Sequence, residues 1–238
     1  MGAVRKLRTR AFERFFRRFL TIDSEKVTGN LVGDIKFTYN LQNYIGAGLT
    51  ERHDTGLSDF GIEVVRRMND LGMVIDVSHA GLKTALDAIE HSRTPILYSH
   101  NASYSLRPSW RTRKDEELVA CARKGGLIAI TAVPNSLSDD PKQNINCVLD
   151  HYDYLVKLVG PDHVGVGTDT LVGDHVAFHA KMLGRLMGSL PAPYLDGLES
   201  PADGKNLVRG LIARGYTDTD VKKIVGGNAL NLFRQVIG

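Results

Sequence analysis

The chain has 238 residues, of which 42% are hydrophobic and 24% charged, a balance typical of globular domains. A net charge of +3 is too small to argue for nucleic-acid binding, and no run of about 18 apolar residues would span a membrane. The two cysteines, Cys121 and Cys147, stand far apart and in no CxxC motif. We therefore expect free thiols in a reducing compartment, which favours a cytoplasmic location.

The first 30 residues differ in composition from the rest of the chain. Residues 1–20 are rich in Lys and Arg, and their apolar residues recur at spacings of three and four, which predicts an amphipathic helix. Three interpretations stay open: a surface helix packed on the protein body, a helix that contacts a membrane surface or partner, and a targeting presequence. The turn-prone run Thr28-Gly29-Asn30 predicts a boundary between a basic segment, residues 1–30, and a single domain, residues 31–238.

Strand-like and helix-like segments alternate through this domain. Short apolar runs predict five strands, over Ile35–Thr38, Met73–Val77, Pro95–Ser99, Leu127–Val133 and Val164–Thr168. Helical spacing predicts helices over Asp59–Leu71, Leu82–Ile89, Asp115–Ala122, Ile145–Leu158, Asn206–Arg214 and Thr219–Leu232. Strand–helix–strand order with apolar strands predicts an α/β fold with a parallel sheet under helices, either a TIM-type barrel or a doubly wound sheet.

Polar side chains follow four of the five predicted strands. Tyr39 and Asn40 follow the first strand, His79 the second, His100 the third and Asp169 the fifth. Because the carboxyl ends of parallel strands meet at one end of a sheet, we expect these side chains to converge. The histidines follow neighbouring strands about 4.8 Å apart, so both imidazoles could bind one metal ion. Taken singly, each histidine is more simply a packing or loop residue.

Three further candidates each have a structural alternative. Asp169 follows V-G-V-G-T, whose glycines allow close backbone approach, and acts either as a general acid or base or as a turn residue. Arg111, in RPSWRTRKDEEL, either clamps a substrate carboxylate or belongs to a solvated basic loop with its neighbours Arg107, Arg113 and Lys114. Asp76 lies within a strand and points away from the candidate site, so it needs a partner and has a structural or ligand-supporting role.

Several segments together resemble the membrane (renal-type) dipeptidase family. They are FTYNLQNYIGAGLTER (37–52), GLSDFGIEVVRRMNDLGMVIDVSH (57–79), PILYSH (95–100), HVGVGTD (163–169), GLESPADGKNLVRGLIARGY (197–216) and IVGGNALNLF (224–233). The match runs in order from about residue 35 to the end. The resemblance implies a TIM-type barrel with two zinc ions at the strand carboxyl ends. It also implies hydrolysis of small dipeptides, in some members with a D-residue on the C-terminal side.

The resemblance implies roles for individual positions. His79 and His100 match two histidine ligands of one zinc ion, and Asp169 matches the aspartate that handles the catalytic proton. Arg111 matches the arginine that holds the substrate carboxylate, although Thr112 stands where an asparagine usually follows it.

Two residues that follow the first predicted strand are predicted to bind substrate. Tyr39 stands where many family members have a substrate-contacting histidine. Asn40, directly after it, completes the set of substrate-binding residues that we predict.

Other family features have no counterpart in this sequence. The family's HxD pair and the glutamate that bridges both zinc ions are not matched, and residues 1–34 contain no histidine. We therefore expect at most one zinc ion, an incomplete site, and a partial barrel of about five strands corresponding to the later part of the family domain. Open sheet edges could pair with a second copy, which could supply the missing ligands.

Three functional hypotheses follow. The first is a metal-dependent dipeptidase. The second is a catalytically inactive remnant or binding module of the same family. The third, a (β/α) lyase that binds a phosphorylated substrate, is disfavoured because no glycine-rich phosphate loop follows a strand.

Overall fold

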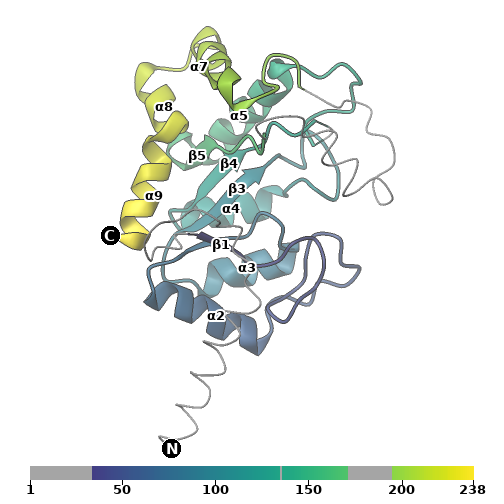
Figure 1. Cartoon of the computed structure of the whole chain (residues 1–238), viewed down its shortest axis with the longest axis vertical. Helices are drawn as coiled ribbons and strands as arrows, with labels where there is room; N and C mark the ends of the chain where they lie inside the picture. The colour runs from purple at the N-terminus through teal and green to yellow at the C-terminus, as the bar shows by residue number, and fades with distance from the viewer. Residues whose placement is uncertain (1–33, 135, 171–194) are drawn as a thin grey trace, which may run out of the picture.

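The computed structural model describes residues 34–134, 136–170 and 195–238, and its centre is a parallel sheet (Figure 1). The strands are β1 (Asp34–Lys36), β2 (Val74–Asp76), β3 (Ile96–Asn101), β4 (Leu127–Ile130) and β5 (Val164–Val166), paired in sequential order. Strand order reverses at a switch point in a doubly wound sheet but not in a TIM-type barrel. The α/β fold with a partial barrel of five parallel strands is thereby confirmed. The expected helix over residues 1–20 and the boundary at residue 30 lie outside the described residues.

Helices connect successive strands and complete the chain. They are α2 (Asp59–Asp70), α3 (Leu82–His91), α4 (Asp115–Arg123), α5 (Ile145–Val159), α7 (Gly204–Ala213), α8 (Asp218–Lys222) and α9 (Asn228–Ile237). The last predicted helix, over Thr219–Leu232, is wrong as a single element. A π-type turn over Lys223–Gly227 separates α8 from α9, and Gly226 within it leaves the helical conformation (φ 166°, ψ −26°). Glycine weakens a helix because it has the most backbone freedom to lose.

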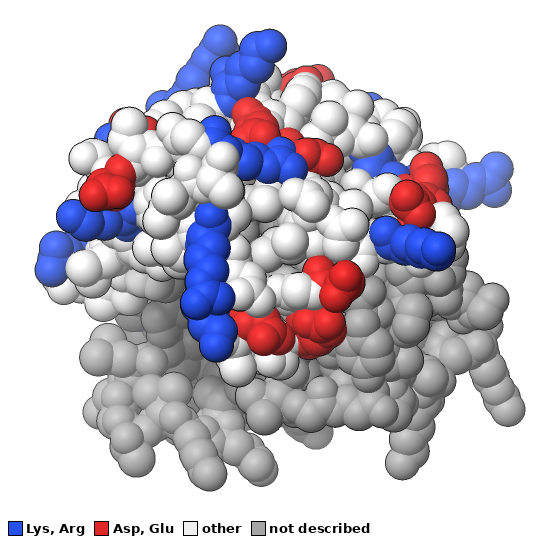
Figure 2. All heavy atoms as spheres, turned by 90° about the horizontal axis from the view of Figure 1, so that it is seen from above, with Lys and Arg blue, Asp and Glu red and all other residues white. Residues whose placement is uncertain are grey.

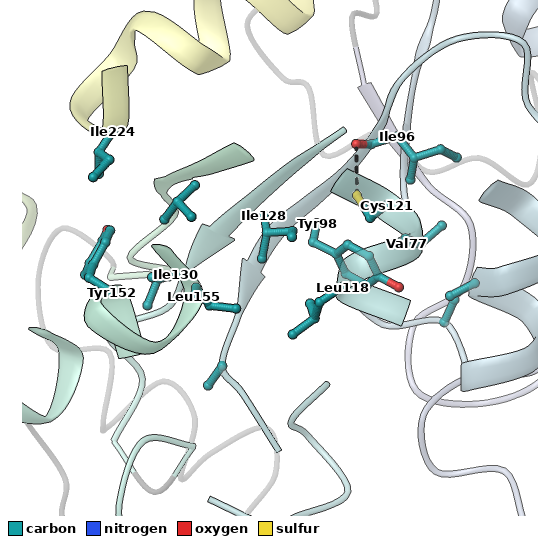
Figure 3. Close-up of a cluster of buried hydrophobic side chains, with 14 of the residues drawn as sticks. Val77, Ile96, Tyr98, Leu118, Cys121, Ile128, Ile130, Tyr152, Leu155 and Ile224 are labelled. Carbon is teal, nitrogen blue, oxygen red and sulfur yellow. Dashed lines mark hydrogen bonds between the residues drawn. The ribbon is translucent and has the colours of Figure 1, made fainter. Parts of the chain in front are cut away.

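Apolar residues are buried on both faces of the sheet. Ile75, Tyr98 and Ile128 point toward the helices that connect the strands, where Tyr98 lies near Leu118 of α4 (Figure 3). Residues next to them in sequence point to the opposite face, as strand geometry requires. There Val74, Leu97 and Leu127 form a smaller core with Leu232 and Val236 of α9. Because α9 covers the amino-terminal halves of the strands, the carboxyl ends are left for a site.

The loop between β1 and α2 is fastened beside the carboxyl end of β2. Gly81 precedes α3 and offers no side-chain cap, and the distant Asp54 carboxylate takes that role, with its Oδ2 accepting from the backbone N–H of Lys83 at 2.6 Å. The backbone N–H of Leu49 donates to the carbonyl oxygen of His79 at 3.0 Å. A helix amino terminus has unpaired N–H groups, so this anchoring satisfies α3 and positions the loop together.

The state of the cysteines and the mix of surface charges are those that the composition predicts. Cys121 is buried with its Sγ 3.6 Å from the carbonyl oxygen of Ile96 (Figure 3), Cys147 is half-buried, and both are free thiols as expected. None of the helices in the described ranges is long and apolar enough to cross a membrane. Acidic and basic side chains are interspersed over the described part of the face seen in Figure 2. That face therefore shows mixed charge rather than one dominant sign.

Candidate metal and catalytic site

His79 and His100 lie together at the carboxyl ends of β2 and β3. Their Nε2 atoms are 2.9 Å apart, the ring centroids are 5.0 Å apart, and both side chains are buried. Side-chain alternation along regular strands does not by itself account for the close approach of the two rings. β2 ends at Asp76, three residues before His79, and the register of β3 against β4 shifts between Tyr98 and Asn101. A register shift of this kind can re-aim side chains, and His100 lies within it.

The second nitrogen of each ring contacts an oxygen atom. His79 Nδ1 lies 2.7 Å from Asn40 Oδ1, and His100 Nδ1 lies 2.7 Å from Ser99 Oγ. Ser99 Oγ in turn donates to Asp76 Oδ2 at 2.7 Å. The partner that a buried Asp76 was expected to need is therefore present, and it connects Asp76 to the candidate ligand His100.

Both histidines are held in the neutral form. Burial lowers the pKa of His79 and of His100, and the positive charge of Arg111 lowers both further. A buried imidazolium next to a guanidinium would be poorly solvated and repelled, so the proton is lost. Neutral imidazole is the form that binds metal ions.

A carboxylate and a guanidinium adjoin the histidine pair. Asp169 Oδ2 lies 3.8 Å from His100 Nε2, and the Asp169 side chain is 41% exposed. Arg111 Nη2 lies 3.4 Å from His79 Nε2, and its Nη1 donates to the carbonyl oxygen of Ser78 at 3.2 Å. Burial, with repulsion from Arg113, lowers the pKa of Arg111 to about 10, which leaves it protonated at neutral pH. A carboxylate and a guanidinium therefore both lie within 4 Å of the imidazole Nε2 atoms.

Thr112 shapes the turn that presents Arg111. Its hydroxyl donates to the carbonyl oxygen of Arg107 at 2.8 Å and accepts from the backbone N–H of Ser109 at 3.1 Å. The threonine at this position therefore closes the turn locally through its hydroxyl.

Tyr39 and Asn40 border the same pair of histidines. The Tyr39 ring stacks on the His79 ring at a centroid distance of 4.4 Å and is 56% exposed, so one face is accessible from solvent. Asn40 and Asp169 have φ angles of 59° and 57°, and among the described residues they are the non-glycine residues with positive φ. Backbone strain of this kind concentrates at functional sites, where surrounding contacts hold it in place.

Comparisons with known proteins decide the family. The family model for membrane dipeptidase (peptidase family M19) matches residues 32–237. The chain belongs to the membrane dipeptidase family. Dipeptidase tcpJ of Claviceps purpurea is 31% identical over 182 residues, and dipeptidase 3 of Mus musculus is 30% identical over 182 residues. Each alignment covers 76% of this chain but only 39% and 33%, respectively, of the relative, so the chain spans a minor part of their length.

Solved structures share the fold of this chain. An amidohydrolase from Pseudomonas aeruginosa superposes with a TM-score of 0.78 and 32% identity, covering 87% of this chain and 65% of that one. A metallopeptidase from Rhodobacter sphaeroides, liganded with a phosphinate mimic of the dipeptide L-Ala-D-Ala, superposes with a TM-score of 0.71 and 21% identity, covering 85% and 55%. At 21% identity, the metallopeptidase supports a shared fold and nothing more.

In this member of the membrane dipeptidase family, His79 and His100 can supply part of the ligand set of a metal ion. Two tetrahedral nitrogen ligands, each about 2.0–2.1 Å from a zinc ion, are separated by about 3.3 Å. The 2.9 Å between His79 Nε2 and His100 Nε2 is close to this value. Within the described ranges, however, no three His, Cys, Asp or Glu side chains are grouped to hold an ion. The two histidines therefore fit as two ligands of a set that usually contains three from the protein.

Arg113 was misjudged in the sequence. The structural alternative for Arg111 counted Arg113 among the residues of a solvated basic loop, but the structure buries Arg113 to 1% exposure. Its guanidinium donates to the carbonyl oxygens of Val77 and Ala80, at 3.1 and 2.7 Å, and pairs with Glu117 at 3.3 Å. The i,i+4 spacing of Arg113 and Glu117 was the available signal. Arg113 therefore supports the turn on which His79 stands.

Proposed function

We propose that this chain takes part in metal-dependent hydrolysis of dipeptides, with one zinc ion held by His79 and His100. The proposal rests on one observation above all: two neutral imidazoles face each other with their Nε2 atoms 2.9 Å apart. A carboxylate, Asp169, and a guanidinium, Arg111, adjoin the same pair. The relatives named as dipeptidases are much longer than the matched region, so the activity is inferred for this chain from its own residues.

The side chains suit distinct parts of peptide hydrolysis. Arg111 stays protonated, so it can pair with the carboxylate of a dipeptide and fix its orientation. Asp169 is exposed and within 4 Å of His100, so it can take a proton from an attacking water and pass it to the leaving amine. The exposed face of Tyr39 offers an aromatic surface to a substrate side chain. A zinc ion held by the histidines would supply Lewis acidity at the scissile carbonyl.

The remaining metal ligands lie beyond the described residues under this proposal. A second copy of the chain is one possible source of them. β1 and β5 are at the two edges of the described sheet, and an unpaired edge strand is a ready surface for another strand. A homo-oligomer joined there would complete both a sheet and a site.

Turnover by the zinc-loaded full chain tests the proposal. A panel of dipeptides, including some with a C-terminal D-residue, is incubated with wild type and with Asp169→Asn, and released amino acids are quantified. General acid–base catalysis contributes about 10²–10⁴-fold, so Asp169→Asn should lower kcat by at least about 100-fold. The matched control is Asp162→Asn, which changes an exposed aspartate at the opposite end of β5. Equal rates for wild type and Asp169→Asn would contradict the proposal.

The two-ligand count among the described residues favours a second candidate, a dipeptide-binding module without turnover. Arg111 and Tyr39 would then still bind the substrate, whereas Asp169 would have no catalytic effect. Dipeptide binding by calorimetry, lost in Arg111→Gln and unaccompanied by hydrolysis, would favour this candidate.

A further inference from the structure

Asp76 is surrounded by hydrogen-bond donors. Ser78 donates to Asp76 Oδ1 from its backbone N–H at 2.9 Å and from its hydroxyl at 2.6 Å. Ser99 donates to Asp76 Oδ2 from its hydroxyl at 2.7 Å. The carboxyl group is fully buried, and an ionised carboxylate has only acceptor sites. Both serine hydroxyl protons therefore point at Asp76.

This arrangement fixes the proton on His100. Since the Ser99 hydroxyl proton is directed to Asp76 Oδ2, Ser99 Oγ has only lone pairs to offer its other neighbour. That neighbour is His100 Nδ1, at 2.7 Å. The contact requires a proton on Nδ1, and a neutral imidazole carries one proton. His100 Nε2 is therefore left with a lone pair.

Asn40 does the same for His79. Its side-chain oxygen lies 2.7 Å from His79 Nδ1 and can only accept, so Nδ1 carries the proton and Nε2 a lone pair. The backbone of Asn40 is held in place because its carbonyl oxygen accepts from the N–H and the hydroxyl of Thr50, at 2.9 and 2.7 Å. The left-handed φ of 59° at Asn40 belongs to this anchored loop.

Two lone pairs now face each other across 2.9 Å. Two acceptors cannot hydrogen-bond to one another, so the pair is complementary to a positive species between or beside them. Arg111 Nη2, at 3.4 Å from His79 Nε2, already lies on that side. We propose that Asn40 and the Ser99–Asp76 pair are positioning residues that lock both histidines as Nδ1–H tautomers and aim both Nε2 lone pairs at one cation.

This inference deepens the proposed function, because the cation is taken to be the catalytic metal, but the tautomer assignment holds or fails without it. It also changes the role of Asn40. Its position after the first predicted strand led us to predict substrate binding, whereas its side-chain oxygen contacts His79. Outer hydrogen bonds of this kind typically change metal affinity by about 10–100-fold.

Imidazole nitrogen shifts of the ¹⁵N-labelled, metal-free full chain at neutral pH test the inference. Wild type should show pyrrole-type Nδ1 and pyridine-type Nε2 signals for both histidines, assigned with His79→Gln and His100→Gln. Ser99→Ala should convert His100 to a mixture of tautomers and weaken zinc binding about 10–100-fold, measured against a chromophoric chelator. Ser99→Thr, which keeps the hydroxyl, should restore both properties. Ser105→Ala, at an exposed serine that contacts Asp115, should leave both unchanged.

For Asn40, the left-handed backbone guides the choice of variants. Asn40→Gly removes the acceptor without straining φ, and should release the His79 tautomer, whereas Asn40→Asp keeps an acceptor and should retain it. An Nε2–H signal for either histidine in wild type would overturn the inference whatever the metal affinity. Correct tautomers together with no zinc binding would instead overturn the proposed function and leave the positioning roles intact.

Discussion

Arg113 gives the sharpest stability prediction, because it is a buried charge with several partners. Its guanidinium donates to the backbone carbonyl oxygens of Val77 and Ala80 and pairs with Glu117, itself 2% exposed. Replacing Arg113 by methionine keeps an unbranched side chain but removes every one of these donors. We expect Arg113→Met to be among the most damaging single changes outside the histidine pair.

The magnitude follows from what the substitution leaves behind. Removing one partner of a buried ion pair costs about 3–5 kcal/mol, because the other charge stays buried and unpaired. The freed carbonyls add about 1–3 kcal/mol each where water cannot reach them. Burial already raises the pKa of Glu117 despite the nearby guanidinium, so Glu117 takes up a proton more readily still without Arg113. We therefore expect a loss of at least about 4 kcal/mol at neutral pH.

Urea unfolding of the full chain measures this loss, with free energies from linear extrapolation. In the structure the Tyr98 hydroxyl donates to Glu117 Oε2 at 2.9 Å, and Glu117→Gln keeps an oxygen that can accept this bond. Glu117→Gln should therefore lower the free energy of unfolding by less than Arg113→Met. The double variant should cost clearly less than the sum of the two, since the pair is lost only once. A loss below about 1 kcal/mol for Arg113→Met would refute the argument that this guanidinium holds the turn beneath His79.

Two further predictions concern titration and reactivity. Burial lowers the pKa of His79, His100 and His151, so their neutral forms stabilise the fold above the unfolded pKa of about 6.5. The free energy of unfolding should fall between pH 7.5 and pH 5.5, by up to about 1.4 kcal/mol per pH unit for each histidine. A free energy of unfolding, measured with urea, that rises as the pH is lowered over this window would contradict the prediction. Burial also raises the pKa of Cys121, so iodoacetamide should modify Cys147 alone until urea unfolds the chain, as intact mass would show.

The sheet was predictable because its signals are local. Short apolar runs bounded by turn residues gave all five strands, and helical spacing gave the connecting helices. The break in the last predicted helix was not predictable in this way. The apolar periodicity on both sides outweighed the Gly226-Gly227 pair that interrupts the helix. Element type follows from nearby residues, whereas a break within a periodic segment depends on what the two halves pack against.

The site was partly predictable for the same reason. Position after a strand was enough to bring His79, His100 and Asp169 into one group. The role of Ser99 depends on Asp76 in the neighbouring strand and on a register shift in β3, neither of which leaves a local trace. Arg113 looked solvated because its neighbours are charged, whereas its burial is set by backbone carbonyls far away in sequence.

Metal content tests the central proposal most directly. The purified full chain is exposed to zinc, freed of unbound metal and examined by elemental analysis beside a His79→Ala/His100→Ala variant. We expect about one zinc ion per chain in wild type, because two facing neutral imidazoles can bind one ion, and none in the variant. An absence of zinc in wild type, or equal zinc in both proteins, would contradict a metal site at these histidines.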